Sequence, residues 1–284
     1  MTTVAIVGFG DMGEPMAPHL VAAGHEVRVS DTDPAKRKRA AALGASVHTT
    51  PADAARGARL TLGLVMSDDI PAAYLGPDGI LAGAEPDSLV LVCSTTTPEL
   101  LDTVVLAAPA GVTVLDAPIV GGVKYARERG ITFLVGAAPD AFARARPVLE
   151  TLGKARHVGE PGSGVAYKLI NNVAIMAAEA GIREALDLAD HLGQDYDTAL
   201  DLMAVGPMAA VVARARDTTN PRPLRRSAED DDTLLTAVPD PARQLPISHA
   251  AAGRLWEAVT AVDGHEPDFV DLTRKTTARE EFRS

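Results

Sequence analysis

A glycine-rich turn near the start of the chain constrains the fold more than any other feature. Residues 4–7 form an apolar run of strand length, and Gly8, Gly10 and Gly13 follow in the spacing GxGxxG ahead of a helical pattern. In such a turn the first glycine allows a tight bend, the second admits a diphosphate to the backbone, and the third lets helix and strand pack closely. The spacing alone occurs by chance in loops, so the segments around it determine its meaning.

The next part of the chain supplies that context. A second run of strand length, 26–30, is followed by Asp31, which lies 23 residues beyond Gly8 (31 − 8). An acid at this place accepts hydrogen bonds from the adenosine ribose of a dinucleotide, which predicts NAD as the cofactor. NADP stays possible because Lys36 or Arg37 could pair with a 2′-phosphate. The basic run that contains these two residues is otherwise interpreted as the solvated face of a helix.

The composition argues against several classes of protein. The net charge is −11 and 4% of the residues are aromatic, so neither nucleic acid nor an anionic membrane is expected as the main partner. Cys93 is the only cysteine, so no disulfide framework is expected and a cytoplasmic location is predicted. No apolar run reaches membrane-spanning length, and neither a secretory signal nor a metal site is expected.

Apolar runs of strand length recur at the spacing of βα units. They lie at 5–7, 27–29, 60–65, 89–92, 112–115 and 133–135, with alanine-rich helical stretches between them such as 34–43 and 98–107. This alternation predicts an α/β fold with a Rossmann doubly wound parallel sheet. The glycine-rich segment 159–164 is the best candidate boundary, so we expect a dinucleotide-binding domain over 1–162 and an all-helical second domain over 163–284.

The second domain is expected to begin with one long helix. Residues 165–192 have a helical pattern and look apolar nearly all round, which implies burial against other helices or against a second subunit. We therefore expect a homodimer or a larger homo-oligomer. Several prolines break the rest of the chain into short segments, and the polar residues 272–284 are expected to fray.

This long helix carries a lysine and an asparagine with catalytic potential. Lys168 and Asn172 are four residues apart and therefore share one face of the helix. Their apolar neighbours would exclude water, and a desolvated lysine has its pKa lowered towards neutrality, as a general acid or base requires. Alternatively, Lys168 extends from a buried helix to solvent and the asparagine is satisfied by backbone.

Two further turns follow strand-like runs, where ligands of open α/β sheets bind. In the segment 115–123, Gly121 and Gly122 expose successive N–H groups that could form an anion nest, or could simply make a turn. In the segment 92–98, hydroxyl groups could reach the cofactor, although Thr97 fits equally well as a helix cap before a proline. The predicted cofactor-binding residues are Gly8, Phe9, Gly10, Asp11, Met12, Gly13, Asp31, Met66 and Thr95.

Taken together, four ordered motifs resemble the β-hydroxyacid dehydrogenase family, which includes 3-hydroxyisobutyrate dehydrogenase and, more distantly, 6-phosphogluconate dehydrogenase. The motifs are Gly8-x-Gly10-x-Met12-Gly13-x-Pro15-Met16, Ser94-Thr95, Asp116-Ala117-Pro118-x-x-Gly121-Gly122 and Gly164-x-x-x-Lys168-x-x-Asn171-Asn172. The resemblance implies that Lys168 is the general acid/base and that Asn172 holds the lysine and the substrate. It also implies that Gly121 and Gly122 bind a substrate carboxylate and that Thr95 lies near the nicotinamide.

The chain departs from the family pattern at two places. Val120 stands where the family usually has a serine that helps to bind carboxylate. Glu229 and Asp230 stand where the family has a Lys-Asp pair, although the run from Ser227 could instead cap a helix. Both changes remove groups that attract an anion, so Val120 and Glu229 are predicted to alter the substrate.

The predicted function is that of an NAD(P)-dependent dehydrogenase or reductase of the β-hydroxyacid dehydrogenase type, with a small hydroxy-acid-like or alcohol/carbonyl substrate. An imine or amine oxidoreductase on the same scaffold is one alternative, because an acid at position 229 would suit a cationic iminium. A non-catalytic dinucleotide-binding protein is a second alternative. The presence of Lys168 argues against both.

Overall fold

The computed structural model describes residues 2–220, 222–261 and 266–273. The chain divides into two compact units, Met1–Leu169 and Ile170–Ser284. Helix α9 (Ser163–His191) begins in the first unit and continues into the second. The domain boundary expected between residues 162 and 163 stays a prediction.

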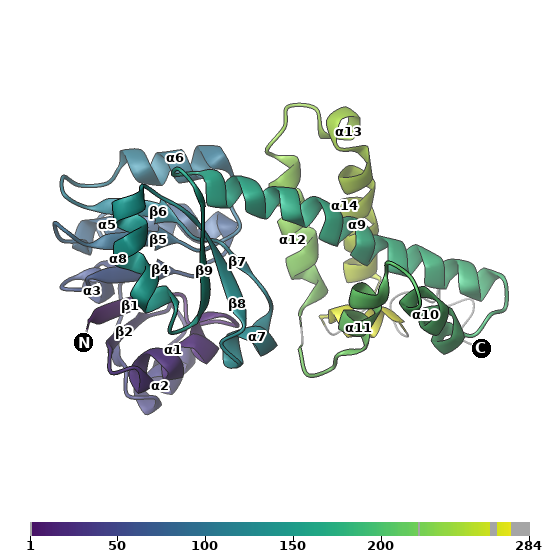
Figure 1. The fold of residues 1–284 in the computed structure, drawn as a ribbon, viewed down its shortest axis with the longest axis horizontal. Coiled ribbons are helices and arrows are strands. Elements are labelled where there is room, and N and C mark those ends of the chain that lie inside the picture. Colours follow the sequence, from purple (N-terminus) through teal and green to yellow (C-terminus); the bar gives the residue numbers. More distant parts are fainter. Residues whose placement is uncertain (1, 221, 262–265, 274–284) are drawn as a thin grey trace. The chain divides into compact units, whose positions relative to one another are not determined.

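The first unit is built on one sheet (Figure 1). The strand order is β3-β2-β1-β4-β5-β6-β8-β7, and β9 pairs with β8. Neighbouring strands from β3 to β6 pair in parallel, in the order of a Rossmann fold. The predicted doubly wound sheet is therefore confirmed. The strands are β1 (Thr3–Val7), β2 (Glu26–Ser30), β3 (Ser46–His48), β4 (Leu60–Gly63), β5 (Leu89–Val92), β6 (Thr113–Asp116), β7 (Ile119–Val120), β8 (Ile131–Gly136) and β9 (Gly153–Gly159).

The far edge of the sheet differs from the expected parallel pattern. Strand β8 runs antiparallel to β6 and β7, because the chain turns back after the short strand β7, whose Ile119 pairs with Phe133. Strands β3, β7 and β9 were not among the expected strands. β3 and β7 have three and two residues, and β9 is rich in charged residues, so none of them carries an apolar run.

The helices of the first unit begin where the sequence gives a start signal. Asp33 caps α2 by accepting from the N–H of Ala35, and a proline occupies the first turn of both α2 and α6. Thr97 caps α6 by accepting from the N–H of Leu100 at 3.2 Å, so the interpretation of Thr97 as a helix cap is confirmed. The helices are α1 (Gly13–Ala22), α2 (Pro34–Ala42), α3 (Pro51–Ala55), α4 (Ile70–Tyr74), α5 (Ile80–Gly83), α6 (Pro98–Leu106), α7 (Val123–Arg127) and α8 (Pro139–Leu149), with a 3₁₀ turn η1 (Ser67–Asp69).

The core of the first unit lies on the central strands. Every residue of β4 and β5 is buried, as expected for parallel strands with both faces covered by helices. Ile6, Leu62 and Leu91 are fully inaccessible to solvent. This rigid centre places the carboxyl ends of β1, β4 and β5 at one edge of the sheet.

The second unit is helical in its described residues, as predicted. Its core gathers Met176, Leu200, Leu224, Leu255 and Phe269 from five elements. The expectation that residues 272–284 fray falls almost wholly outside the described residues. Besides α9 the elements are α10 (Tyr196–Ala204), α11 (Ala209–Arg216), α12 (Leu224–Leu235), α13 (Pro241–Gln244), α14 (Pro246–Thr260) and the 3₁₀ turn η2 (Phe269–Thr273).

Helix α9 is long, as predicted, but the expectation that it is apolar nearly all round is wrong. Glu179 and Arg183 are buried on one side, whereas Ile170 and Leu188 are 63% and 56% exposed on others. Burial lowers the pKa of Arg183 to about 8, and the charges of Glu179 and Asp187 oppose this. Among the described residues no helix is both long and apolar enough to cross a membrane.

Candidate cofactor and catalytic site

The turn after β1 has the backbone that the glycine spacing predicts. Gly8 has a φ of +94°, and its N–H donates to the carbonyl of Ser30 at 2.9 Å. A Cβ at Gly8 would overlap the carbonyl of Leu64, and a Cβ at Gly13 would overlap the carbonyl of Gly8. Both positions therefore exclude any side chain, the first for the bend and the second for the approach of α1.

Gly10 is different, because its surroundings are open. The only atom within 4 Å of a Cβ built there would be Nζ of Lys36, at 3.7 Å, among the described residues. The N-terminus of α1 follows three residues later, and a helix N-terminus favours negative charge. These residues fit the diphosphate of a dinucleotide: the backbone at Gly10 would approach it and the start of α1 would face it.

Asp31 fastens this turn to the end of β2. Its Oδ2 accepts from the N–H of Phe9 at 2.7 Å, and its Oδ1 accepts from the N–H of Asp33 at 2.9 Å. Nζ of Lys36 lies 3.7 Å from Oδ2, and Arg37 donates to the carbonyl of Asp31 at 2.6 Å. The basic run was expected to be a solvated helix face. That expectation is wrong for these two residues, which fold back onto the acid because α2 starts directly after it.

The ends of β4 and β5 lie side by side next to the glycine turn. The hydroxyl of Ser94 donates to the carbonyl of Val65 at 2.5 Å, which joins the two strand ends. Met66 follows Val65 at the start of η1, and Thr95 follows Ser94; both are half-buried. Sequence reasoning therefore placed these two candidates on neighbouring strand ends, as ligands of an open α/β sheet require.

The turn after β6 meets the start of α9. Asp116 ends β6 with 0% exposure, and its carboxylate accepts from the N–H groups of Gly162 and Val165. Gly121 has a φ of +120° and is exposed, whereas Val120 is half-buried in β7. The structure thus brings the Asp116–Gly122 segment and the beginning of the lysine-bearing helix into contact within the first unit.

Lys168 and Asn172 lie one turn apart on α9, as the spacing predicts. Lys168 is half-buried, and Asn172 is 1% exposed. Neither polar atom of the Asn172 side chain has a hydrogen-bond partner in the described part of the chain. A buried amide without partners costs about 1–3 kcal/mol, so such a group is suited to a ligand that supplies the missing bonds.

In the second unit, Glu229 and Asp230 each form an ion pair with an arginine. Glu229 lies 3.3 Å from Arg226, and Asp230 lies 2.7 Å from Arg222, which precedes the helix. The alternative that the run from Ser227 caps a helix is wrong, because α12 begins three residues earlier, at Leu224.

Sequence reasoning did not single out Asp231, which is fully buried with both carboxylate oxygens lacking hydrogen-bond partners among the described residues. Burial, and then the charges of Asp232, Asp230 and Glu179, raise the pKa of Asp231 to about 7. The sequence could have indicated this burial, because Asp231 lies on the same face of α12 as the buried residues Ala228 and Leu234.

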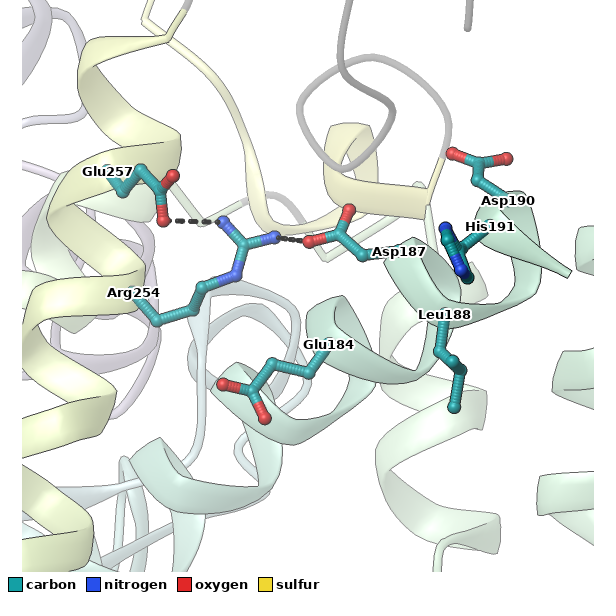
Figure 2. A pocket seen from close by; sticks show the side chains of 7 residues that line it. All are labelled: Glu184, Asp187, Leu188, Asp190, His191, Arg254 and Glu257. Atoms are coloured by element: carbon teal, nitrogen blue, oxygen red, sulfur yellow. Dashed lines mark hydrogen bonds and ion pairs between the residues drawn. The ribbon is translucent and has the colours of Figure 1, made fainter.

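A cavity of about 480 Å³ in the second unit was also not predicted (Figure 2). Figure 2 shows the guanidinium of Arg254 reaching between two acids, at 2.5 Å from Asp187 and 3.5 Å from Glu257. No group of three or more metal-ligating side chains occurs in residues 2–220, 222–261 and 266–273. The lining residues are Glu184, Asp187, Leu188, Asp190, His191, Arg254 and Glu257.

The strand order, the glycine turn and the acid after β2 define a Rossmann-type dinucleotide-binding protein. Residues 3–165 match the family described as the NAD binding domain of 6-phosphogluconate dehydrogenase. A 3-hydroxyisobutyrate dehydrogenase of Pseudomonas aeruginosa is 39% identical over 198 residues, which are 69% of this chain and 66% of that relative.

Solved structures extend the likeness over nearly the whole chain. The 3-hydroxyisobutyrate dehydrogenase of Mycobacterium tuberculosis, solved with L-serine, is 30% identical with a TM-score of 0.80, covering 96% of this chain and 98% of that one. An imine reductase of Myxococcus stipitatus, solved with NADP⁺, has a TM-score of 0.67 at 21% identity, covering 96% of this chain and 99% of that one. The second likeness shows the fold alone.

The chain belongs to the β-hydroxyacid dehydrogenase family, and the predicted resemblance is confirmed. It is an NAD(P)-dependent oxidoreductase that acts on a small molecule.

Proposed function

We propose that this enzyme oxidises a small hydroxy acid with NAD, using Lys168 as the general base. The observation that carries the proposal is the contact between the Asp116–Gly122 segment and the first turn of α9, through the bond from Val165 to Asp116. This contact puts the segment expected to bind a carboxylate beside the helix that carries the lysine. Hydride would leave the carbinol carbon for the nicotinamide of the bound cofactor, while the Lys168 amine takes the hydroxyl proton.

Asn172 would orient the substrate hydroxyl and the lysine. Its buried amide has no partner among the described residues, and its place one turn beyond Lys168 puts it on the same helix face. A substrate oxygen would satisfy the amide donor. This role predicts that substrate affinity and turnover both depend on the amide.

The proposed preference for NAD rests on Asp31. This carboxylate is held in place by two backbone N–H groups at 2.7 and 2.9 Å. It would accept hydrogen bonds from the ribose hydroxyls of NAD and repel the 2′-phosphate of NADP. Lys36 would attract the 2′-phosphate. Its ion pair with Asp31 partly neutralises its charge and so weakens that attraction.

For the substrate we propose a small amino-bearing hydroxy compound, such as an amino-hydroxy acid of the serine type. Val120 lacks the hydroxyl donor of the family, and Glu229 stands where the family has a cation. An ammonium group on the substrate would therefore be favoured over an additional anionic group. The relative solved with L-serine supports this class. Arg226 lies 3.3 Å from Glu229, so the two side chains together present less negative charge than Glu229 alone.

A cofactor-absorbance assay tests the proposal. We expect NADH formation with L-serine and little or none with 3-hydroxyisobutyrate or glycerate, and we expect the double variant Val120→Ser with Glu229→Lys to restore the latter activity. Efficient oxidation of 3-hydroxyisobutyrate by the unaltered enzyme would show that Glu229 does not act on the substrate. Activity on cyclic amines alone would replace the proposal by an amine oxidoreductase.

A homodimer or larger homo-oligomer is proposed from the apolar residues that α9 leaves exposed. Ile170, Ile175 and Leu188 are 63%, 36% and 56% exposed, and burying such area against a second copy contributes about 25 cal/mol per Å². We also propose a cytoplasmic location, supported by the single cysteine, Cys93, which cannot form a disulfide within the chain.

A further inference from the structure

Helix α9 follows a glycine, so the position before the helix supplies no side-chain cap. The residue before the helix is Gly162, with a φ of +93°, and it has no side chain to accept from the free N–H groups of the first turn. Asp116, 46 residues earlier in the chain, takes that role. Its Oδ1 accepts from the N–H of Gly162 at 2.7 Å, and its Oδ2 accepts from the N–H of Val165 at 2.8 Å.

The carboxylate is itself fixed by the sheet. Asp116 is the last residue of β6, and the next N–H, of Ala117, donates to the carbonyl of Val92 on β5 at 2.8 Å. On the other side Asp116 pairs with Gly136 of β8, where a Cβ would lie 2.5 Å from Oδ1. The acid therefore cannot shift without moving three strands.

The first turn of α9 is equally crowded. A Cβ on Gly164 would overlap the carbonyl of Leu134 and would lie 2.7 Å from Oδ2 of Asp116. Burial raises the pKa of the Asp116 carboxyl, and backbone hydrogen bonds, first those from Gly162 and Val165, oppose this. The fully buried position and the two bonds to N–H groups mark a carboxylate used as an internal helix anchor.

We infer that Asp116 is a positioning residue for Lys168. Lys168 lies three residues after Val165, so the anchored residue and the lysine occupy neighbouring positions on the helix, about one turn apart. Fixing Val165 to the end of β6 fixes the point from which the Lys168 side chain leaves the helix, relative to the Gly121–Gly122 turn that follows β7, the short strand after β6. This inference rests on the proposed role of Lys168 and adds the residue that sets its position.

The test is the isosteric variant Asp116→Asn, which replaces one acceptor oxygen by an NH₂ group facing a backbone N–H. We expect kcat to fall about 10- to 100-fold, because displacements of about 1 Å cost rates of this order, while KM for NAD stays unchanged. Replacing the carboxylate by a neutral amide also removes a negative charge from the end of β6, so the rising limb of the pH–rate profile should move to lower pH. A loss of folded enzyme would lower the apparent kcat at every pH and would leave the shape of the pH–rate profile unchanged.

Two control variants separate position from stability. Val90→Ala shortens a fully buried side chain of β5 and should lower the melting temperature without changing kcat or the pH profile. Should Asp116→Asn fail to fold, Gly164→Ala displaces the first turn while keeping the acid, and we expect it to lower kcat. Gly181→Ala, on the same helix, is its matched control and should leave kcat unchanged, because no atom of the described residues outside the helix backbone lies within 4 Å of the added Cβ.

Lys168→Ala distinguishes this inference from the proposed function. If Lys168→Ala is inactive and either Asp116→Asn or Gly164→Ala keeps the parental kcat, the positioning role of Asp116 is overturned and the proposed function stands. If Lys168→Ala keeps its activity, the proposed role of the lysine is overturned together with this inference. In the inactive Lys168→Ala background, Asp116→Asn should cause no further loss of the residual rate.

Discussion

Replacing one buried acid by its amide is expected to make the protein more stable. Asp231 is 0% exposed, and neither carboxylate oxygen has a hydrogen-bond partner among the described residues. Its pKa is raised from 3.8 to about 7, by burial first and by Asp232, Asp230 and Glu179 after it. Because the pKa of Asp231 is higher in the folded state than in the unfolded state, ionisation of this acid destabilises the folded protein. The free energy of unfolding is therefore unaffected below about pH 4 and falls as the pH rises towards about 7 and beyond.

The loss is large. A difference of about three pH units corresponds to about 4 kcal/mol at pH 8, which Asp231→Asn should recover because the amide never ionises. The melting temperature at pH 8 should rise by about 10 °C, whereas parent and variant should melt together near pH 4.

Thermal unfolding followed by circular dichroism between pH 4 and pH 8 measures both differences. The adjacent Asp230→Asn is the control with the opposite sign, because it breaks an ion pair of 2.7 Å with Arg222 and should destabilise at pH 8. A melting temperature of Asp231→Asn that matches the parent's at pH 8 would refute the reasoning.

Three further predictions concern the cofactor and the assembly. The specificity constant should be higher for NAD than for NADP, and a parent enzyme that prefers NADP would contradict this. Asp31→Ser should reduce the NAD-to-NADP ratio of specificity constants roughly tenfold, because it leaves the charge of Lys36 without its partner acid. Gly13→Ala should abolish NAD binding in calorimetry, because the added Cβ overlaps the carbonyl of Gly8, and NAD binding equal to the parent's would count against the proposed cofactor turn. Light scattering at micromolar concentration should give at least twice the chain mass of 29.5 kDa, and a monomer mass would disprove the proposed oligomer.

The first unit could be predicted well because its signals are local. An apolar strand ending in glycines, followed by a capped helix, determines backbone geometry within a few residues, and Gly8, Asp31 and Thr97 all occupy the expected places. The antiparallel β8 could not be predicted in this way. Its apolar run looks like that of any buried strand, and its direction depends on a hairpin through the two-residue strand β7.

The second unit and the anchor of α9 show what sequence reasoning misses. The pattern of α9 looked apolar nearly all round, yet Glu179 and Arg183 are buried. Glu179 interacts electrostatically with Arg214 of α11, and Arg183 with Arg254 of α14 as well as with Glu179 and Asp187 of its own helix. Asp116 was visible only as part of a motif, since its partners Gly162 and Val165 are remote in sequence. Such pairings depend on the folded arrangement of distant segments, and no local periodicity signals them.

The most direct test of the central claim is to compare Lys168→Ala with the parent for NAD binding and for turnover of L-serine. The account predicts that the NAD dissociation constant stays within about twofold while turnover falls about 10²- to 10⁴-fold, the usual cost of removing a general acid or base. Lys154→Ala, which removes an exposed lysine of β9, should change neither quantity. Turnover by Lys168→Ala at the parental rate would contradict the account and make Glu229 or Asp230 the next candidates.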